Sequence, residues 1–273
     1  MKTFRSFSWV AALAAVLCAG AAFAQDAPAA KPADAKTRIK AISSRLEDLV
    51  GVRGAERTAA LELAAREFEA IAAEFPADKA LVAQANWEAG ECWRRAERIE
   101  SASAAYGRVL DSGDVRFRQR ALFQRAGMLR RGKQLEEAQK LYAEAGAIEP
   151  ESVRAHDARL WVARVLEMRG EHDAAVEAYR KAVASAAGAR RIIEASDALA
   201  KLLVRRGDLE GARAAIAHAE QAAAGEIEGG GEDAERIQKA LEEMSARGML
   251  RRATDKSTEA GKAAEDVEIS RGR

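Results

Sequence analysis

The sequence is poor in cysteine, proline and aromatic residues, and each shortage excludes a class of structure. It has two cysteines and four prolines in 273 residues, and only 5% of its residues are aromatic. Because Cys18 falls in an apolar N-terminal segment, Cys92 is the one cysteine of the remaining chain, and no disulfide can staple that part. No segment alternates apolar and polar residues as a half-buried strand does. Stability must therefore come from the packing of helices.

Long hydrophobic runs are also missing beyond the first 24 residues, so no membrane span is expected there. The first 24 residues have the parts of a secretory signal peptide: positive charges at Lys2 and Arg5, an apolar stretch over 10–17, and a small-x-small site that ends at Ala24. We expect cleavage between Ala24 and Gln25 and export of the chain, which would make the protein periplasmic or secreted.

Neither sign of charge dominates. The chain has 44 Lys and Arg against 43 Asp and Glu, and loss of Lys2 and Arg5 with the signal leaves 42 against 43. A protein that binds nucleic acid through its backbone phosphates needs an excess of positive charge. We therefore expect no nucleic-acid partner.

What the sequence does contain is a five-fold repeat. In each copy a small residue is followed four positions later by an aromatic or large apolar residue, and three positions after that by another small or apolar one. The copies are Ala64/Phe68/Ile71, Ala102/Tyr106/Val109, Ala138/Tyr142/Ala145, Ala175/Tyr179/Ala182 and Ala212/Ile216/Ala219, and their first residues are 38, 36, 37 and 37 positions apart. A period in this range is typical of stacked helical hairpins, which present binding surfaces and seldom catalyse reactions.

The apolar periodicity predicts two helices for each copy of the repeat. The expected pairs are about 39–50 with 56–74, 78–96 with 101–110, 117–131 with 135–147, 152–169 with 173–186, and 191–206 with 209–223. Gly132, Gly170 and Gly207 are expected to end the first helix of their pairs in the left-handed conformation.

The segments outside the repeats have other compositions. Residues 25–37 predict a flexible leader, and the glycine-rich stretch 225–231 a joint. Residues 232–250 predict a helix that caps the open end of the array with Ile237, Leu241 and Met244. Residues 251–273 have almost no apolar side chains and predict a disordered tail.

The repeat resembles the tetratricopeptide repeat, a helical hairpin of about 34 residues with small and aromatic residues at fixed places in both helices. The residues that carry the resemblance are Gly90, Trp93, Ala102, Tyr106, Ala126, Ala138, Tyr142, Pro150, Ala163, Gly170, Ala175, Tyr179, Ala200, Gly207 and Ala212. It covers about 38–224, and the first hairpin matches least. It implies an all-α, right-handed superhelical solenoid of about five helix-turn-helix hairpins with a capping helix at the C-terminal end.

In that family the first helix of each hairpin lines a concave groove. The resemblance places these residues in a partner-binding groove: Trp87, Arg94, Arg95, Arg120, Phe123, Arg130, Arg131, Trp161, Arg164, Lys201 and Arg205. Arginines interleaved with aromatics would suit an extended, acidic partner segment. The alternative interpretation is that the arginines keep the helices soluble while Trp87 and Trp161 pack between hairpins. The lysine and asparagine set of the family's carboxylate-clamp members is not reproduced, so capture of a terminal carboxylate is not expected.

Other reactive residues give weaker signals. Cys92 stands beside Trp93 where the repeat holds a small buried residue, so it replaces an alanine in the core or, alternatively, forms an exposed reactive thiol. His156, His172 and His218 are isolated, and no catalytic or phosphate-binding motif is present in the sequence. We therefore expect no metal site, no cofactor and no enzymatic activity.

The sequence thus predicts a non-catalytic protein-interaction module or assembly scaffold of the bacterial cell envelope. Its expected partner is a protein or peptide segment, and the chain itself is expected to be a monomer or a weak homo-oligomer. A second hypothesis is a self-associating structural component in which the apolar end of the array, or the 39–50 helix, pairs with another copy. A third is a hydrolase with scattered carboxylates, which would need two of them about 5 to 9.5 Å apart in a cleft.

Overall fold

The computed structural model describes residues 32–256, which form helices joined by short turns, and this part of the chain contains no strand. The signal peptide expected over 1–24 and the tail beyond 256 lie outside the described residues. Residues 245–256 are also helical. The named helices are α1 (Pro32–Glu47), α2 (Gly54–Glu74), α3 (Lys79–Arg95), α4 (Ile99–Asp111), α5 (Arg118–Arg131), α6 (Leu135–Ala147), α7 (Val153–Met168), α8 (His172–Ala184), α9 (Ala189–Arg205), α10 (Leu209–Glu228) and α11 (Glu232–Glu242).

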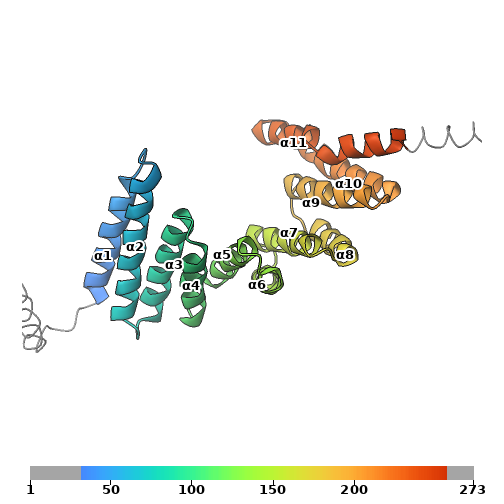
Figure 1. Ribbon diagram of the computed structural model, residues 1–273. Helices are drawn as coiled ribbons and strands as arrows, with labels where there is room; N and C mark the ends of the chain where they lie inside the picture. Colours follow the sequence, from blue (N-terminus) through green and yellow to red (C-terminus); the bar gives the residue numbers. More distant parts are fainter. Residues whose placement is uncertain (1–31, 257–273) are drawn as a thin grey trace, which may run out of the picture.

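The helices pack in chain order, each against the next, so that five hairpins follow one another along an elongated array (Figure 1). The hairpins are α1–α2, α3–α4, α5–α6, α7–α8 and α9–α10. Further contacts join first helices, since α1 contacts α3 and α5 contacts α7, and α11 packs on both α9 and α10. The predicted all-helical solenoid of helical hairpins is confirmed.

The repeated small and aromatic residues form the centre of each hairpin. Tyr106, Tyr142 and Tyr179 are buried, and so is the alanine that precedes each of them by four residues. Alanine lets two helices approach closely, and the tyrosine ring fills the gap beside it. The approach is tightest at Gly90, where an added Cβ would lie 2.6 Å from Cε1 of Tyr106.

The turns inside the hairpins repeat as regularly as the helices. One residue in each turn of the second to fifth hairpins has a left-handed backbone: Glu97 (φ 60°), Lys133 (φ 63°), Gly170 (φ 79°) and Gly207 (φ 80°). The amide of the next residue then donates to a carbonyl five residues back, as Gln134 does to Leu129 and Asp208 to Leu203. The prediction for Gly132 was wrong by one position, because Gly132 has φ −76° and Lys133 makes the turn.

The start of the array lies earlier than the composition predicts. Helix α1 begins at Pro32, so the flexible leader expected over 25–37 is wrong for residues 32–37. Proline suits the first turn of a helix, and Asp34 complements the helix dipole there. Ala35 and Ile39 are buried against the rest of the chain, which stabilises the extra turns.

The C-terminal end also differs from the predicted boundaries. Helix α10 continues to Glu228, so only 229–231 remain of the joint expected over 225–231. The added turns are fixed by Glu226, whose carboxylate accepts a hydrogen bond of 2.8 Å from the Ala189 amide.

The helix expected over 232–250 is interrupted after α11, and a further helical segment covers 245–256, so the tail prediction is wrong for 251–256. That segment begins where Asp197 accepts a hydrogen bond of 2.9 Å from the Ala246 amide.

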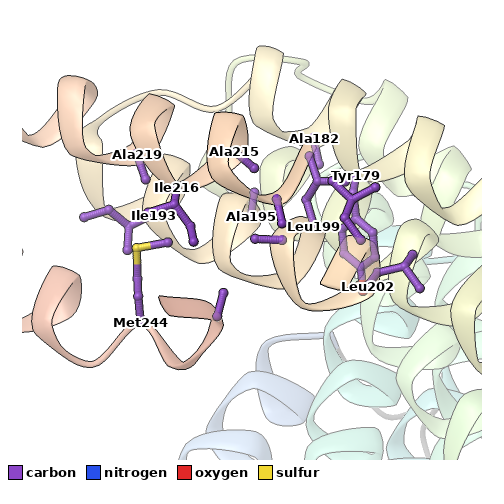
Figure 2. Packing of buried hydrophobic residues seen from close by; sticks show 14 of the residues in the cluster. Tyr179, Ala182, Ile193, Ala195, Leu199, Leu202, Ala215, Ile216, Ala219 and Met244 are labelled. Atoms are coloured by element: carbon purple, nitrogen blue, oxygen red, sulfur yellow. The ribbon is translucent and has the colours of Figure 1, made fainter. Parts of the chain in front are cut away.

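Apolar residues of the last helices close the C-terminal end of the core. Figure 2 shows Met244 reaching toward Ile193 of α9 and Ile216 of α10. Ile237 and Leu241 of α11 are buried in the same cluster. The last complete hairpin therefore does not expose its apolar side to water, which is the requirement that a terminal repeat must meet.

We predict that Gly90→Ala destabilises the protein by roughly 1 to 3 kcal/mol, because the new methyl group overlaps the buried Tyr106 ring. The matched control is Gly225→Ala in α10, where an added Cβ meets nothing within 4 Å. It should stabilise the helix by roughly 0.5 to 1 kcal/mol. Chemical denaturation followed by circular dichroism measures both, and equal effects of the two substitutions would contradict the close approach at Gly90.

Candidate functional site

Two adjoining hollows run along α7 and α9. The first has a volume of about 540 Å³ and the second about 510 Å³, and Trp161, Arg164 and Glu194 line both. We call the combined surface the α7–α9 groove. Its lining residues are Phe123 of α5; Val153, Asp157, Leu160, Trp161, Arg164, Glu167 and Met168 of α7; Tyr179 of α8; and Arg190, Arg191, Glu194, Asp197, Ala198, Lys201 and Arg205 of α9.

Trp161 lies at the centre of a set of stacked side chains. Its ring is nearly parallel to that of Tyr142, with the centroids 5.9 Å apart and an angle of 12° between the planes. The guanidinium of Arg130 lies 4.2 Å from the Trp161 centroid and that of Arg164 lies 4.9 Å from it. Phe123 meets the edge of Tyr142 at 5.3 Å. Cation–π contacts of this kind fix the guanidinium groups in place.

Several cations of the groove are already paired. Arg164 binds Glu194 at 2.9 Å and Lys201 binds Asp197 at 2.5 Å, while Arg205 binds Glu167. These pairs hold the side chains along α7 and α9 in fixed positions.

Other cations near the groove have no anionic partner. Within the described residues Arg190 forms no ion pair, and Arg191 donates only to the Ala187 carbonyl. Burial raises the pKa of Asp157, and the charge of Glu194 adds to that rise. Burial likewise lowers the pKa of His156, with Arg159 and Arg191 contributing. The lining of the first hollow contains three arginines, Arg164, Arg190 and Arg191, and two carboxylates, Asp157 and Glu194. It therefore has an excess of positive charge.

Two exposed apolar side chains lie at the ends of the groove. Val153 at the start of α7 is 56% exposed and Met168 at its end is 53% exposed. An isolated exposed apolar residue needs no explanation, but two along one hollow are typical of a contact surface. The sequence reasoning missed both. The sequence pattern that could have identified them is their spacing from Trp161. Val153 precedes it by eight residues and Met168 follows it by seven, and both intervals are close to two helical turns, so the three residues lie on one side of α7.

The structure brings together about half of the residues predicted for the groove. Those at or against the α7–α9 groove are Phe123, Arg130, Trp161, Arg164, Lys201 and Arg205. Those that line neither hollow are Trp87, Arg94, Arg95, Arg120 and Arg131. Residues that the prediction missed, besides Val153 and Met168, are Asp157, Arg190, Arg191 and Glu194. A binding role for any of them stays a prediction.

Trp87 shows why some of the predicted residues do not line the α7–α9 groove. Its ring stacks on Phe117 at 5.7 Å and meets Tyr106 at 5.5 Å, so it packs between hairpins, as the alternative interpretation proposed. Arg94 is held by Glu91 at 2.7 Å. The side chains of Arg95, Arg120 and Arg131 are exposed to solvent.

Other candidate chemistry finds little support in residues 32–256. No group of three His, Cys, Asp or Glu side chains in this part is placed to hold a metal ion. Among the described helices, none combines the length and the apolar character needed to cross a membrane. Cys92 is buried, so the alternative of an exposed reactive thiol is wrong.

We predict that Cys92 is inert in the folded protein. Burial raises the pKa of its thiol from 9.0 to about 12, with the nearby Glu88 charge contributing, so the reactive thiolate is absent near pH 8. The thiol reagent DTNB should react only at the rate of unfolding.

Because the folded pKa of Cys92 lies above the unfolded one, the thiol's contribution to stability is present below pH 9.0 and is lost toward about pH 12. A Cys92→Ala variant should lack that part of the pH dependence, and fast DTNB labelling of the native protein would refute the prediction.

Comparison with known proteins identifies the fold. No protein-family model matches the sequence, and no curated protein is similar to it. A crystal structure of MamA is 15% identical, covers 69% of this chain and 92% of its own, and has a TM-score of 0.54. The TPR-like repeats of a putative kinesin light chain from Podosopora anserina are 13% identical, cover 70% of this chain and 95% of their own, and have a TM-score of 0.52. At these identities the likeness concerns the fold, and the chain has the helical-hairpin repeat fold of the tetratricopeptide-repeat proteins.

Proposed function

We propose that this protein is a non-catalytic interaction module that holds an extended segment of a partner protein in the α7–α9 groove. The observation that carries the proposal is the coincidence, on one hollow surface, of the Trp161 ring, two exposed apolar side chains and a first hollow in which three arginines face two carboxylates. Aromatic rings and arginine are the side chains that contribute most to protein–protein affinity.

The dimensions of the groove suit a short segment. Val153 and Met168 are fifteen residues apart on α7, which corresponds to roughly 22 Å at the helical rise per residue. An extended peptide covers that length with about seven residues. Trp161 lies between the two ends, so a bound segment would contact an apolar side chain at each end and the aromatic ring in the middle.

Three of the five cations that line the groove are fixed before any partner binds. Ion pairs hold Arg164, Lys201 and Arg205, and packed helices support all of them. The loss of conformational freedom on binding then falls on the partner segment, and little is added by the receptor. This preorganisation supports a receptor role better than self-association through the 39–50 helix, whose Ile39 and Ile42 are already buried within the chain.

The proposal includes export to the cell envelope, which the charged, apolar and small residues of the first 24 positions support. We predict that the protein recovered from an exporting bacterium begins at Gln25, as measured by the mass of the intact chain. An Ala24→Asp variant should keep its signal, because the cleavage site needs a small residue. Recovery of the chain with Met1 still attached would contradict export by this route.

We predict that a photo-crosslinking amino acid in place of Met168 captures the partner segment. The matched control is the same replacement at Leu63 of α2, which is 51% exposed against 53% for Met168 but lies outside the groove. Adding Trp161→Ala should abolish the Met168 crosslink, with circular dichroism confirming that the variant is folded. Equal crosslinking from both positions, or no effect of Trp161→Ala, would refute the groove assignment.

A further inference from the structure

The repeated tyrosine of two hairpins binds a carboxylate of its own chain. In α3–α4 the Tyr106 hydroxyl donates to Glu91 Oε1 at 2.6 Å. In α7–α8 the Tyr179 hydroxyl donates to Glu167 Oε2 at 2.7 Å. Both tyrosines are buried, and burial together with the neighbouring carboxylate raises the pKa of each phenol. A buried hydroxyl bound to a carboxylate thus occurs in two of the three hairpins that contain the tyrosine.

A guanidinium binds the same carboxylate in both hairpins. Arg94 pairs with Glu91 at 2.7 Å, and Arg205 of the next hairpin pairs with Glu167. Each carboxylate thus bridges a tyrosine hydroxyl and an arginine. Charge-assisted hydrogen bonds of this kind are the stronger ones in proteins.

The hairpin between them, α5–α6, has the tyrosine and the arginine but lacks the carboxylate. Counted back from the left-handed turn residue, Gly127 holds the place of Glu91, and Arg130 holds the place of Glu167. A Cβ on Gly127 would lie 3.5 Å from the Tyr142 hydroxyl, so this position adjoins the phenol. Burial raises the pKa of Tyr142, while a side-chain hydrogen bond from Arg130 and the charges of Arg130 and Arg164 oppose that rise.

Arg130 correspondingly has no anionic partner among the described residues. Within residues 32–256 it forms no salt bridge, and its Nε is buried without a hydrogen-bond acceptor. A buried N–H group left without an acceptor is destabilising, because it has lost water and gained nothing in exchange. The guanidinium also lies over Trp161, which lines the α7–α9 groove, so a ligand in the groove has access to its neighbourhood.

We propose that the partner supplies the missing carboxylate. An Asp or Glu side chain of the bound segment would enter the groove beside Trp161 and pair with the Arg130 guanidinium, which lies next to the buried Tyr142. We call Arg130, Tyr142, Trp161 and Arg164 the Arg130 subsite. This inference rests on the proposed function, because it names the chemistry of the segment that the groove would hold.

A carboxylate fits the subsite better than a phosphate does. In each of the two flanking hairpins one glutamate carboxylate lies between a tyrosine and an arginine, although the glutamate comes from a different position of the first helix. Of the two guanidinium groups in the subsite, Arg164 is already bound to Glu194, so the charge of Arg130 remains to be neutralised. One negative charge balances it.

The first test places the carboxylate in the chain itself. Gly127→Glu supplies it at the position that Glu91 occupies in α3–α4, and Gly127→Gln is the matched neutral control, since both lose the same helix-weakening glycine. We expect the Glu variant to melt roughly 3 °C or more above the Gln variant. In an Arg130→Gln background that difference should vanish. A Glu variant no more stable than the Gln variant, or a difference that survives loss of Arg130, would overturn the subsite.

The second test uses a displayed library of random twelve-residue peptides selected against the mature full-length protein. We expect the selected peptides to share an Asp or Glu at one position beside apolar residues. Their affinity should fall roughly tenfold or more with Arg130→Gln or Gly127→Glu, and stay unchanged with Lys181→Gln, an exposed cation on α8 that lines neither hollow.

The outcomes separate the subsite from the groove. Peptides that bind through Trp161 without an acidic preference would overturn the subsite and leave the proposed function standing. Tighter binding when the shared acid is replaced by phosphoserine would overturn the carboxylate assignment in favour of phosphate. Recovery of no peptide, or of peptides indifferent to Trp161→Ala, would contradict the proposed function itself, while the melting comparison would still decide whether the place fits a carboxylate.

Discussion

The close approach of the two helices in each hairpin is the constraint on which the rest of the structure depends. It requires alanine or glycine at the contact and a large side chain beside it, and in three hairpins that side chain is a buried tyrosine. A tyrosine brings a hydroxyl into the interior, and a buried hydroxyl needs a partner. The first helix of a hairpin must therefore carry a polar residue at one of two places facing the ring. Packing and recognition are linked in this way, because the same helix also lines the groove.

Much of the fold follows from the sequence because it is encoded in local spacing. The interval of 36 to 38 residues specifies the hairpins, and α6 covers the predicted 135–147. The ends could not be predicted, because distant residues determine them. Glu226 bonds the start of α9, and Asp197 of α9 bonds the Ala246 amide, contacts 37 and 49 positions apart in the chain. A charged or glycine-containing segment has the composition of a disordered one when its distant hydrogen-bond partners are unknown. For that reason the sequence predicts disorder for residues 251–256, which are helical in the structure.

The site was predictable in part, since the resemblance placed the first helices on the groove but gave every hairpin the same exposure. Trp87 and Phe123 occupy the same place in successive hairpins, counted from the turn, yet Phe117 covers Trp87 while Phe123 remains at the groove. The difference comes from the link before α5, which the repeat pattern does not describe. Ion pairs raise the same difficulty: the sequence shows a row of arginines, but only the structure distinguishes Arg164, which has a partner, from Arg130, whose Nε has none.

The left-handed turn residues have a mechanical consequence. Glycine makes these turns in the fourth and fifth hairpins, but Glu97 and Lys133 make them in the second and third, where a side chain adds strain of about 1 kcal/mol each. In an array whose stability is a sum over neighbouring units, such strain is not shared out but stays local. The third hairpin bears both a strained turn and the unpartnered Arg130 Nε, and Figure 1 shows the helix axes changing direction between α4 and α5. The strained turn and the groove thus share one structural unit, because the hairpin that contains Lys133 also brings Phe123 and Arg130 to the groove, and relaxation of that turn would move both side chains relative to α7.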